Sequence, residues 1–108
     1  MKILSARRVW ERPHGSWVKV AGLVLVRQRP GTAGGIVFAT LEDETGIVNL
    51  IIRPDIYERY RDAARQAALL QAEGYLQRVE NVQHVMAARL LDLSAELSDC
   101  ANRSRDFR

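Results

Sequence analysis

The alternation of apolar and polar residues along the chain predicts five β-strands and one helix. Aliphatic and β-branched side chains dominate five runs, which short segments rich in glycine, proline and charged residues separate. The predicted strands cover residues 17–27, 36–42, 47–52, 69–77 and 82–91. Over residues 54–67 apolar side chains recur at steps of three and four, which predicts a single amphipathic helix that begins at Pro54.

Two glycines, Gly22 and Gly74, interrupt the first and the fourth predicted strand. A glycine inside a strand marks a bulge or a sharp bend, and a small closed barrel needs such bends. Five strands, a helix between strands three and four, and bends in strands one and four predict an all-β fold, the five-stranded Greek-key OB-fold barrel. An SH3-like barrel is disfavoured because it has no place for so long a helix before its fourth strand.

The length of 108 residues allows one domain. We expect an N-terminal extension at 1–16, the barrel at 17–93 and a C-terminal tail at 94–108. No run approaches the roughly 18 apolar residues of a membrane helix, and the N-terminus lacks the apolar stretch of a secretion signal. Cys100 is the single cysteine, which excludes an internal disulfide. We therefore expect a cytoplasmic protein without a membrane partner.

The basic residues are unevenly chosen, since the chain has 14 arginines, only two lysines and a formal net charge of +3. Arginine pairs with phosphate and stacks on bases through its planar guanidinium. A genome rich in G and C would favour arginine codons as well, so the skew alone does not indicate a nucleic-acid partner.

Alternation within the strands predicts a binding face. Because strand side chains alternate, the apolar sets of strands two and three point inward and leave Phe38, Thr40, Asn49, Ile51 and Arg53 outward. In OB-folds these two strands carry the usual ligand surface. Rings and guanidinium planes stack on bases, and arginines pair with phosphates, so these residues form a candidate single-stranded nucleic-acid site. The neighbouring loops add Arg27, Arg29 and Arg78 to it.

Plainer interpretations stay open for these residues. Phe38 could be buried, and the arginines could be solvated surface residues. The three consecutive carboxylates at 42–44 point in alternating directions, which favours a solvated turn over a metal site. His14 and His84 have no partner at ligand spacing. No nucleotide-binding or nucleophile motif is present, so we predict a binding module with no catalytic residue, no metal and no cofactor.

Two stretches, Val20 to Phe38 and Thr40 to Leu50, resemble the C-terminal OB domain of bacterial error-prone DNA polymerases, relatives of the polymerase III alpha subunit. The most specific part is Val26-Arg-Gln-Arg-Pro-Gly31, and residues 104–108 resemble the extreme C-terminus of those proteins. The resemblance implies binding of single-stranded DNA in translesion synthesis and DNA repair, beside other polymerase domains or repair accessory proteins. The palm domain with its metal-binding aspartates is missing, so the resemblance implies a non-catalytic part of a polymerase.

A more distant resemblance is to the anticodon-binding OB domains of the aspartyl-tRNA synthetase type. There a strand-two phenylalanine stacks on a base and a strand-three amide reads it, and Phe38 and Asn49 match those places. The chain departs from the polymerase pattern at Gly34, where a lysine is frequent, and at Arg53, where an aromatic residue is common. Two alternatives therefore stay open: a module that docks a clamp or an accessory repair protein, and a standalone OB protein that binds RNA.

Overall fold

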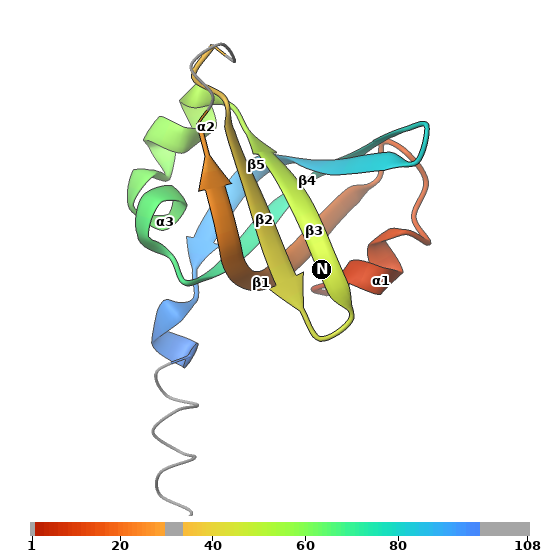
Figure 1. Ribbon diagram of the computed structural model, residues 1–108, viewed down its shortest axis with the longest axis horizontal. Helices are drawn as coiled ribbons and strands as arrows, with labels where there is room; N and C mark the ends of the chain where they lie inside the picture. The colour runs from red at the N-terminus through yellow and green to blue at the C-terminus, as the bar shows by residue number, and fades with distance from the viewer. Residues whose placement is uncertain (1, 30–33, 98–108) are drawn as a thin grey trace, which may run out of the picture.

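The computed structural model describes residues 2–29 and 34–97. They form a closed barrel with the strand order β1-β2-β3-β5-β4 (Figure 1). Neighbouring strands are antiparallel except β3 and β5, which pair in parallel. This topology confirms the predicted five-stranded OB-fold barrel. The strands are β1 (Trp17–Gln28), β2 (Val37–Asp43), β3 (Gly46–Ile52), β4 (Leu69–Val79) and β5 (Val82–Asp92).

The first strand belongs to both halves of the barrel. β1 pairs with β4 up to Leu23 and with β2 from Leu23 onward. Gly22 lies at this exchange of partners, where a Cβ would come within 2.6 Å of the backbone oxygen of Glu42. The register shift itself falls between Val24 and Val26, so Gly22 serves the close approach of two strands and the bulge lies beyond it.

The hairpin of β4 and β5 contains the second predicted bend. Its register shifts between Glu73 and Gly74, which confirms a bulge at Gly74. A Cβ at Gly74 would lie 2.0 Å from the backbone oxygen of Met86, so only glycine fits there. At the tip of the hairpin Glu80 and Asn81 both have positive φ, 50° and 69°. That pair of angles is typical of a type I′ turn, which suits the right-handed twist of a hairpin.

The core lies inside the barrel and takes alternate residues from each strand. In β2 and β3 these are the residues that the alternation predicts, and their outward neighbours are half-buried or exposed. The predicted inward and outward sets of both strands are therefore confirmed. The buried members are Val37, Ala39 and Leu41 of β2 and Val48, Leu50 and Ile52 of β3.

Two short helices, α2 (Pro54–Arg59) and α3 (Arg61–Gln66), stand where a single helix was predicted. The predicted helical segment between β3 and β4 is confirmed in its place, but Tyr60, with φ −116° and ψ 38° outside the helical region, divides it into two helices. Helices this short have little stability of their own and follow the course that packing gives them. Ile56 of α2 and Ala64 of α3 both belong to the core, and the two helices lie together at one end of the barrel (Figure 1).

The residues before β1 pack onto the barrel. The helix α1 (Ala6–Val9) buries two of its four side chains in the same core as the strands. Leu4 forms an isolated parallel bridge with Val20 of β1. Asp43, at the end of β2, accepts a hydrogen bond of 2.7 Å from the backbone N–H of Ala6. The N-terminal extension is therefore continuous with the barrel in its packing.

After β5 a single helical turn covers residues 94–97. The predictions made for Pro30, Gly31, Cys100 and the end of the tail fall outside the described residues. None of the helices in the described ranges has the length and apolar character that crossing a membrane requires.

Candidate nucleic-acid interface

One row of side chains crosses the outside of the barrel at Phe38. Phe38 pairs with Gln28 of β1 on one side and with Ile51 of β3 on the other. Ile51 pairs in turn with Met86 of β5. The Phe38 side chain is half-buried and does not belong to the core, so part of its ring is open to a ligand.

A second, parallel row contains the predicted polar pair. Thr40 lies between Val26 of β1 and Asn49 of β3. The Thr40 hydroxyl donates to Oδ1 of Asn49 at 3.2 Å. Because that acceptor is occupied, Asn49 presents its amide N–H groups, which suit a carbonyl of a base or a phosphate oxygen. His84 lies two residues before Met86 and so on the same side of β5, beside the second row. We call the surface formed by these residues the front face; it consists of Val26, Gln28, Phe38, Thr40, Asn49, Ile51, His84 and Met86.

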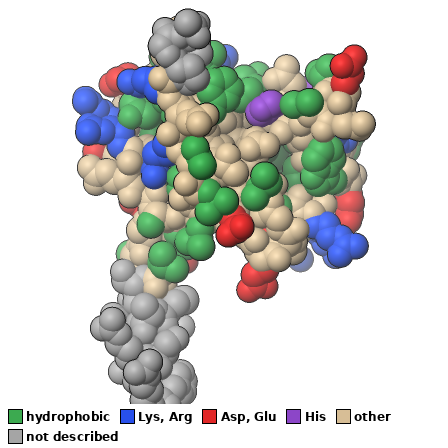
Figure 2. Space-filling view, in the orientation of Figure 1, with side chains coloured by type: hydrophobic (Ala, Val, Ile, Leu, Met, Phe, Trp, Pro, Cys, Tyr) green, Lys and Arg blue, Asp and Glu red, His purple; other side chains and the backbone are tan. Residues whose placement is uncertain are grey.

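Two predicted arginines lie at the helix end of the front face. The Arg29 guanidinium stacks over the ring of Tyr57 in α2, 4.3 Å from its centroid. Stacking occupies the plane of a guanidinium and leaves its N–H edge for a phosphate. Arg53 directly precedes α2, and its Nε lies 4.0 Å from Oδ1 of Asp55 with both side chains mostly exposed, a weak contact. Figure 2 shows basic side chains at this end of the barrel.

The structure does not bring Arg27 to the front face. Arg27 pairs with the buried Ala39, so its side chain leaves β1 on the side that α3 covers. Its Nε donates to the carbonyl of Ala64 at 2.8 Å, and Nη2 donates to the carbonyl of Ala67. Carbonyls at the C-terminal end of a helix have no partner within the helix and attract a cation. Arg27 therefore fastens α3 to β1.

Arg78 is half-buried and likewise hydrogen-bonds to other parts of the protein. Its Nε donates to Oε1 of Gln83 at 2.9 Å, and Nη2 donates to the same oxygen. Nη2 also lies 3.3 Å from the backbone oxygens of both Val9 and Trp10, and the guanidinium lies 5.2 Å from the Trp10 ring centroid. Arg78 thus anchors the end of α1 to the β4–β5 hairpin, a role that no local sequence signal indicated.

Four residues of the front face were not predicted: Val26 and Gln28 of β1, and His84 and Met86 of β5. Alternation within each strand would have placed them outward, but it does not say which strands are neighbours. The β3–β5 pairing joins segments that are far apart in the sequence, and it is the tertiary fold that adds β5 to the face.

A pocket of about 330 Å³ continues the front face between α1 and β3. Asn49 lines it together with Arg7 and Trp10 of the N-terminal extension and Gln83 of β5. Trp10 is 49% exposed, so its ring is available on this surface. The extension therefore enlarges the candidate site.

Asp43 positions the extension relative to this site. Burial alone would raise the pKa of Asp43, but hydrogen bonds from the Thr45 hydroxyl and from the backbone N–H groups of Ala6, Thr45 and Gly46 outweigh it and lower that pKa. A charged carboxylate thus joins the β2–β3 turn to the start of α1. Within residues 2–29 and 34–97, no group of three His, Cys, Asp or Glu side chains is placed to hold a metal ion.

The barrel and its front face belong to a sequence region that matches known proteins. The model of the OB-fold nucleic acid binding domain family matches residues 18–93. The chain is 44% identical over 107 residues to error-prone DNA polymerase 2 of Rhizobium meliloti and 50% identical over 96 residues to the error-prone DNA polymerase of Caulobacter vibrioides. These matches cover 99% and 89% of this chain but only 10% and 9% of the relatives, so the chain spans about a tenth of their length.

Among solved structures, asparaginyl-tRNA synthetase from Pyrococcus horikoshii, complexed with asparaginyl-adenylate, is similar with a TM-score of 0.70. The match covers 86% of this chain and 22% of that one at 21% identity, which shows a shared fold. The family match spans nearly the whole barrel, and the barrel has the topology of that fold. The chain belongs to the OB-fold nucleic acid binding domain family, and it is similar to a short segment of error-prone DNA polymerases.

Proposed function

We propose that the front face binds single-stranded DNA, with the Phe38 ring stacked on one base and the Asn49 amide hydrogen-bonded to a neighbouring base. The observation that carries this proposal is the half-buried, outward-facing Phe38 side chain beside the Thr40–Asn49 pair, within one continuous surface of four strands. Stacking on an aromatic side chain contributes about 1 to 3 kcal/mol per base and tolerates any sequence.

Arg29 and Arg53 contact phosphates at the helix end of the face in this proposal. The N–H edge of Arg29 is held in a fixed orientation by its stacking on Tyr57, so less side-chain entropy is lost when a phosphate binds. Arg27 and Arg78 act indirectly, because they fix α3 and the N-terminal extension that border the face.

The similarity to error-prone DNA polymerases supports a place for this domain in such an enzyme. There it holds the single-stranded template near the active site during translesion synthesis and DNA repair in the cytoplasm, beside the catalytic domains of the same enzyme. The domain itself supplies stacking surface, amide donors and guanidinium groups, which bind a strand and leave polymerisation to the rest of the enzyme.

The test is a fluorescence titration with a labelled strand of about 12 nucleotides, in the range of OB-fold site sizes. Phe38→Ala weakens binding about 10-fold, because it removes one stacked base. Leu91→Ala is the matched control, since Leu91 is 52% exposed on β5 but lies opposite Gln71 of β4, away from the front face. Absence of binding by the wild-type domain at about 50 mM salt, or equal losses in both variants, would contradict the proposal.

Two further experiments, a competition with RNA and a capture of protein partners, distinguish the two alternative functions. An RNA strand of the same sequence differs by its 2′-hydroxyls, so preferential binding of the RNA would assign the face to RNA. A protein partner that is retained from a cell extract after nuclease treatment, and lost when the tail after residue 94 is removed, would favour a protein-docking module instead.

A further inference from the structure

The front face is poor in available cations. Two of the four predicted rim or face arginines, Arg27 and Arg78, direct Nε and Nη2 toward carbonyls and an amide of the protein, away from the front face. Affinity for single strands comes largely from phosphates neutralised by Lys and Arg. That leaves Arg29 and Arg53 at the front face, so further phosphate contacts require cations elsewhere on the molecule.

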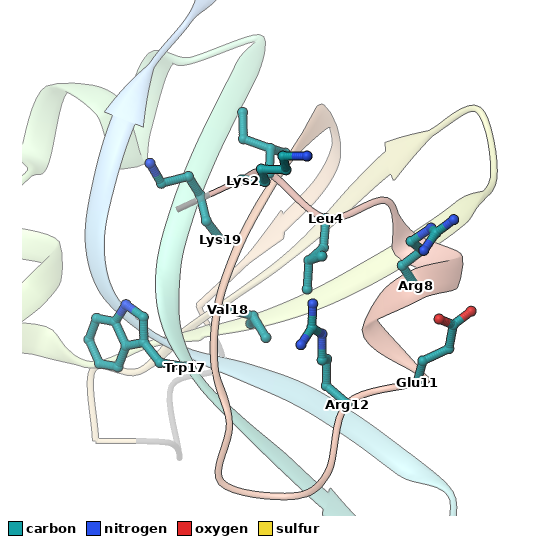
Figure 3. Close-up of a pocket in the computed structure, with 9 residues that line it drawn as sticks. Lys2, Leu4, Arg8, Glu11, Arg12, Trp17, Val18 and Lys19 are labelled. Atoms are coloured by element: carbon teal, nitrogen blue, oxygen red, sulfur yellow. The ribbon is translucent and has the colours of Figure 1, made fainter.

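A cleft of about 840 Å³ lies between the N-terminal extension and the first half of β1 (Figure 3). It contains both lysines of the chain and two of its arginines, from three separate segments. One carboxylate, Glu11, also lines it. The cations are Lys2 near the N-terminus, Arg8 of α1, Arg12 after α1, and Lys19 of β1.

The residues that line the cleft carry a net positive charge as large as that of the whole chain. The four cations and single carboxylate of the cleft amount to +3, which equals the formal net charge of the sequence, so all other residues together are formally neutral. Within the described ranges the ion pairs join Arg53 to Asp55 and Arg89 to Glu73, and none involves a cation of the cleft. An anion can therefore bind there without first displacing a carboxylate partner.

The shape of the cleft also suits a strand. Figure 3 shows Leu4 and Val18 between the two lysines on one side and Arg8 and Arg12 on the other. Trp17 stands at the margin and is 45% exposed. The floor is thus apolar and the walls are cationic, as in grooves that follow a sugar–phosphate backbone.

The helix α1 joins this cleft to the front face. Arg7 and Trp10 line the pocket beside Asn49, whereas Arg8 lines the cleft, so neighbouring residues of one helix border both sites. We propose that the cleft is a second binding site, which takes the phosphodiester backbone of a single strand whose bases stack on the front face. The identification of the ligand as a nucleic-acid strand rests on the proposed function, whereas the positive charge of the cleft is independent of it.

An abasic deoxyribose-phosphate strand of about 12 units isolates the phosphate contacts from stacking, because it has no bases, and substitutions in the cleft then show which of these contacts the cleft makes. The variant R8Q/R12Q lowers the affinity of the domain for this strand about tenfold. It also reduces the slope of log K against log salt concentration by about 1.4, since each phosphate contact on a single strand contributes about 0.7. The control R61Q/R65Q removes the same charge from exposed residues of α3. We expect it to reduce the slope of log K against log salt concentration by less than half as much as R8Q/R12Q does.

The outcomes separate the two sites. If the abasic strand binds and its affinity depends on Arg8 and Arg12, the cleft is supported as a phosphate site. This holds even if Phe38→Ala leaves the affinity for ordinary DNA unchanged, a result that would refute the front face as a base-stacking site. Binding of ordinary DNA without any binding of the abasic strand at about 50 mM salt overturns the cleft and leaves the front face standing. Equal effects of the two double variants, or equally tight binding of polyglutamate, would also overturn it.

Discussion

Replacing Asp43 by asparagine tests how the N-terminal extension is attached. Oδ2 of Asp43 accepts the backbone N–H of Ala6 at 2.7 Å. Oδ1 accepts the N–H and the hydroxyl of Thr45, both at 2.7 Å, and the N–H of Gly46 at 3.1 Å. Both oxygens therefore face donors. An asparagine has one oxygen and one NH₂ group, so either orientation of its amide sets a donor against a donor.

The loss of stability in Asp43→Asn follows from the backbone N–H groups that are left without an acceptor. Ala6 is 3% exposed, and an N–H that loses its partner at a buried residue costs about 1 to 3 kcal/mol. Loss of the charge weakens the hydrogen bonds that remain. We expect Asp43→Asn to lower the free energy of unfolding by about 2 kcal/mol at neutral pH. Glu44→Gln is the matched control: Glu44 is the exposed next residue, and we expect its change to stay within about 0.5 kcal/mol.

The pH dependence gives an independent check. The pKa of Asp43 is lowered in the folded state, so its charged form adds stability that is fully present above the unfolded pKa of about 4. This contribution is lost as the pH falls through the lower, folded pKa. Asparagine does not titrate at this position, and the difference between wild type and variant therefore shrinks in acid.

The assay is urea unfolding followed by the fluorescence of Trp10 and Trp17, at several pH values between about 7 and 3. An Asp43→Asn effect no larger than that of Glu44→Gln would refute the reasoning. A difference from wild type that stays constant down to about pH 3 would refute the assignment of the pH dependence to Asp43.

Three further substitutions probe the frame around the site. Gly74→Ala puts a Cβ 2.0 Å from the backbone oxygen of Met86 and should cost more than about 3 kcal/mol, measured by urea unfolding; a loss below about 1 kcal/mol would contradict this. Arg27→Gln removes two hydrogen bonds to carbonyls at the end of α3 and should cost about 1 to 2 kcal/mol, with faster amide exchange in α3 and little change in β5. The double change E80N/N81G supplies the residues that a type I′ turn prefers and should raise the stability by about 0.5 kcal/mol in thermal melts, whereas a lower melting temperature would argue against that turn type.

The candidate site shows where prediction from sequence ends. Alternation placed Phe38, Thr40 and Asn49 on the outward side of their strands, because each strand imposes a period of two on its own side chains. The sequence assigns Arg27 and Arg78 to the neighbouring loops, whereas they lie within β1 and β4, and the period of two does not say what their side chains bind. These side chains are long, and their partners are carbonyls of segments distant in the chain.

The sequence by itself determined the number and order of the strands, the inward and outward sets of β2 and β3, and the glycines at which strands bend. These features are local, since they depend on side-chain period, on turn chemistry and on the space that a Cβ occupies. Only the tertiary structure decided that the helix breaks at Tyr60, that β5 joins the front face, and that the N-terminal extension completes the core. It also gathered Lys2, Arg8, Arg12 and Lys19 into one cleft. Charges that are scattered along a chain acquire a common field only when folding brings them together.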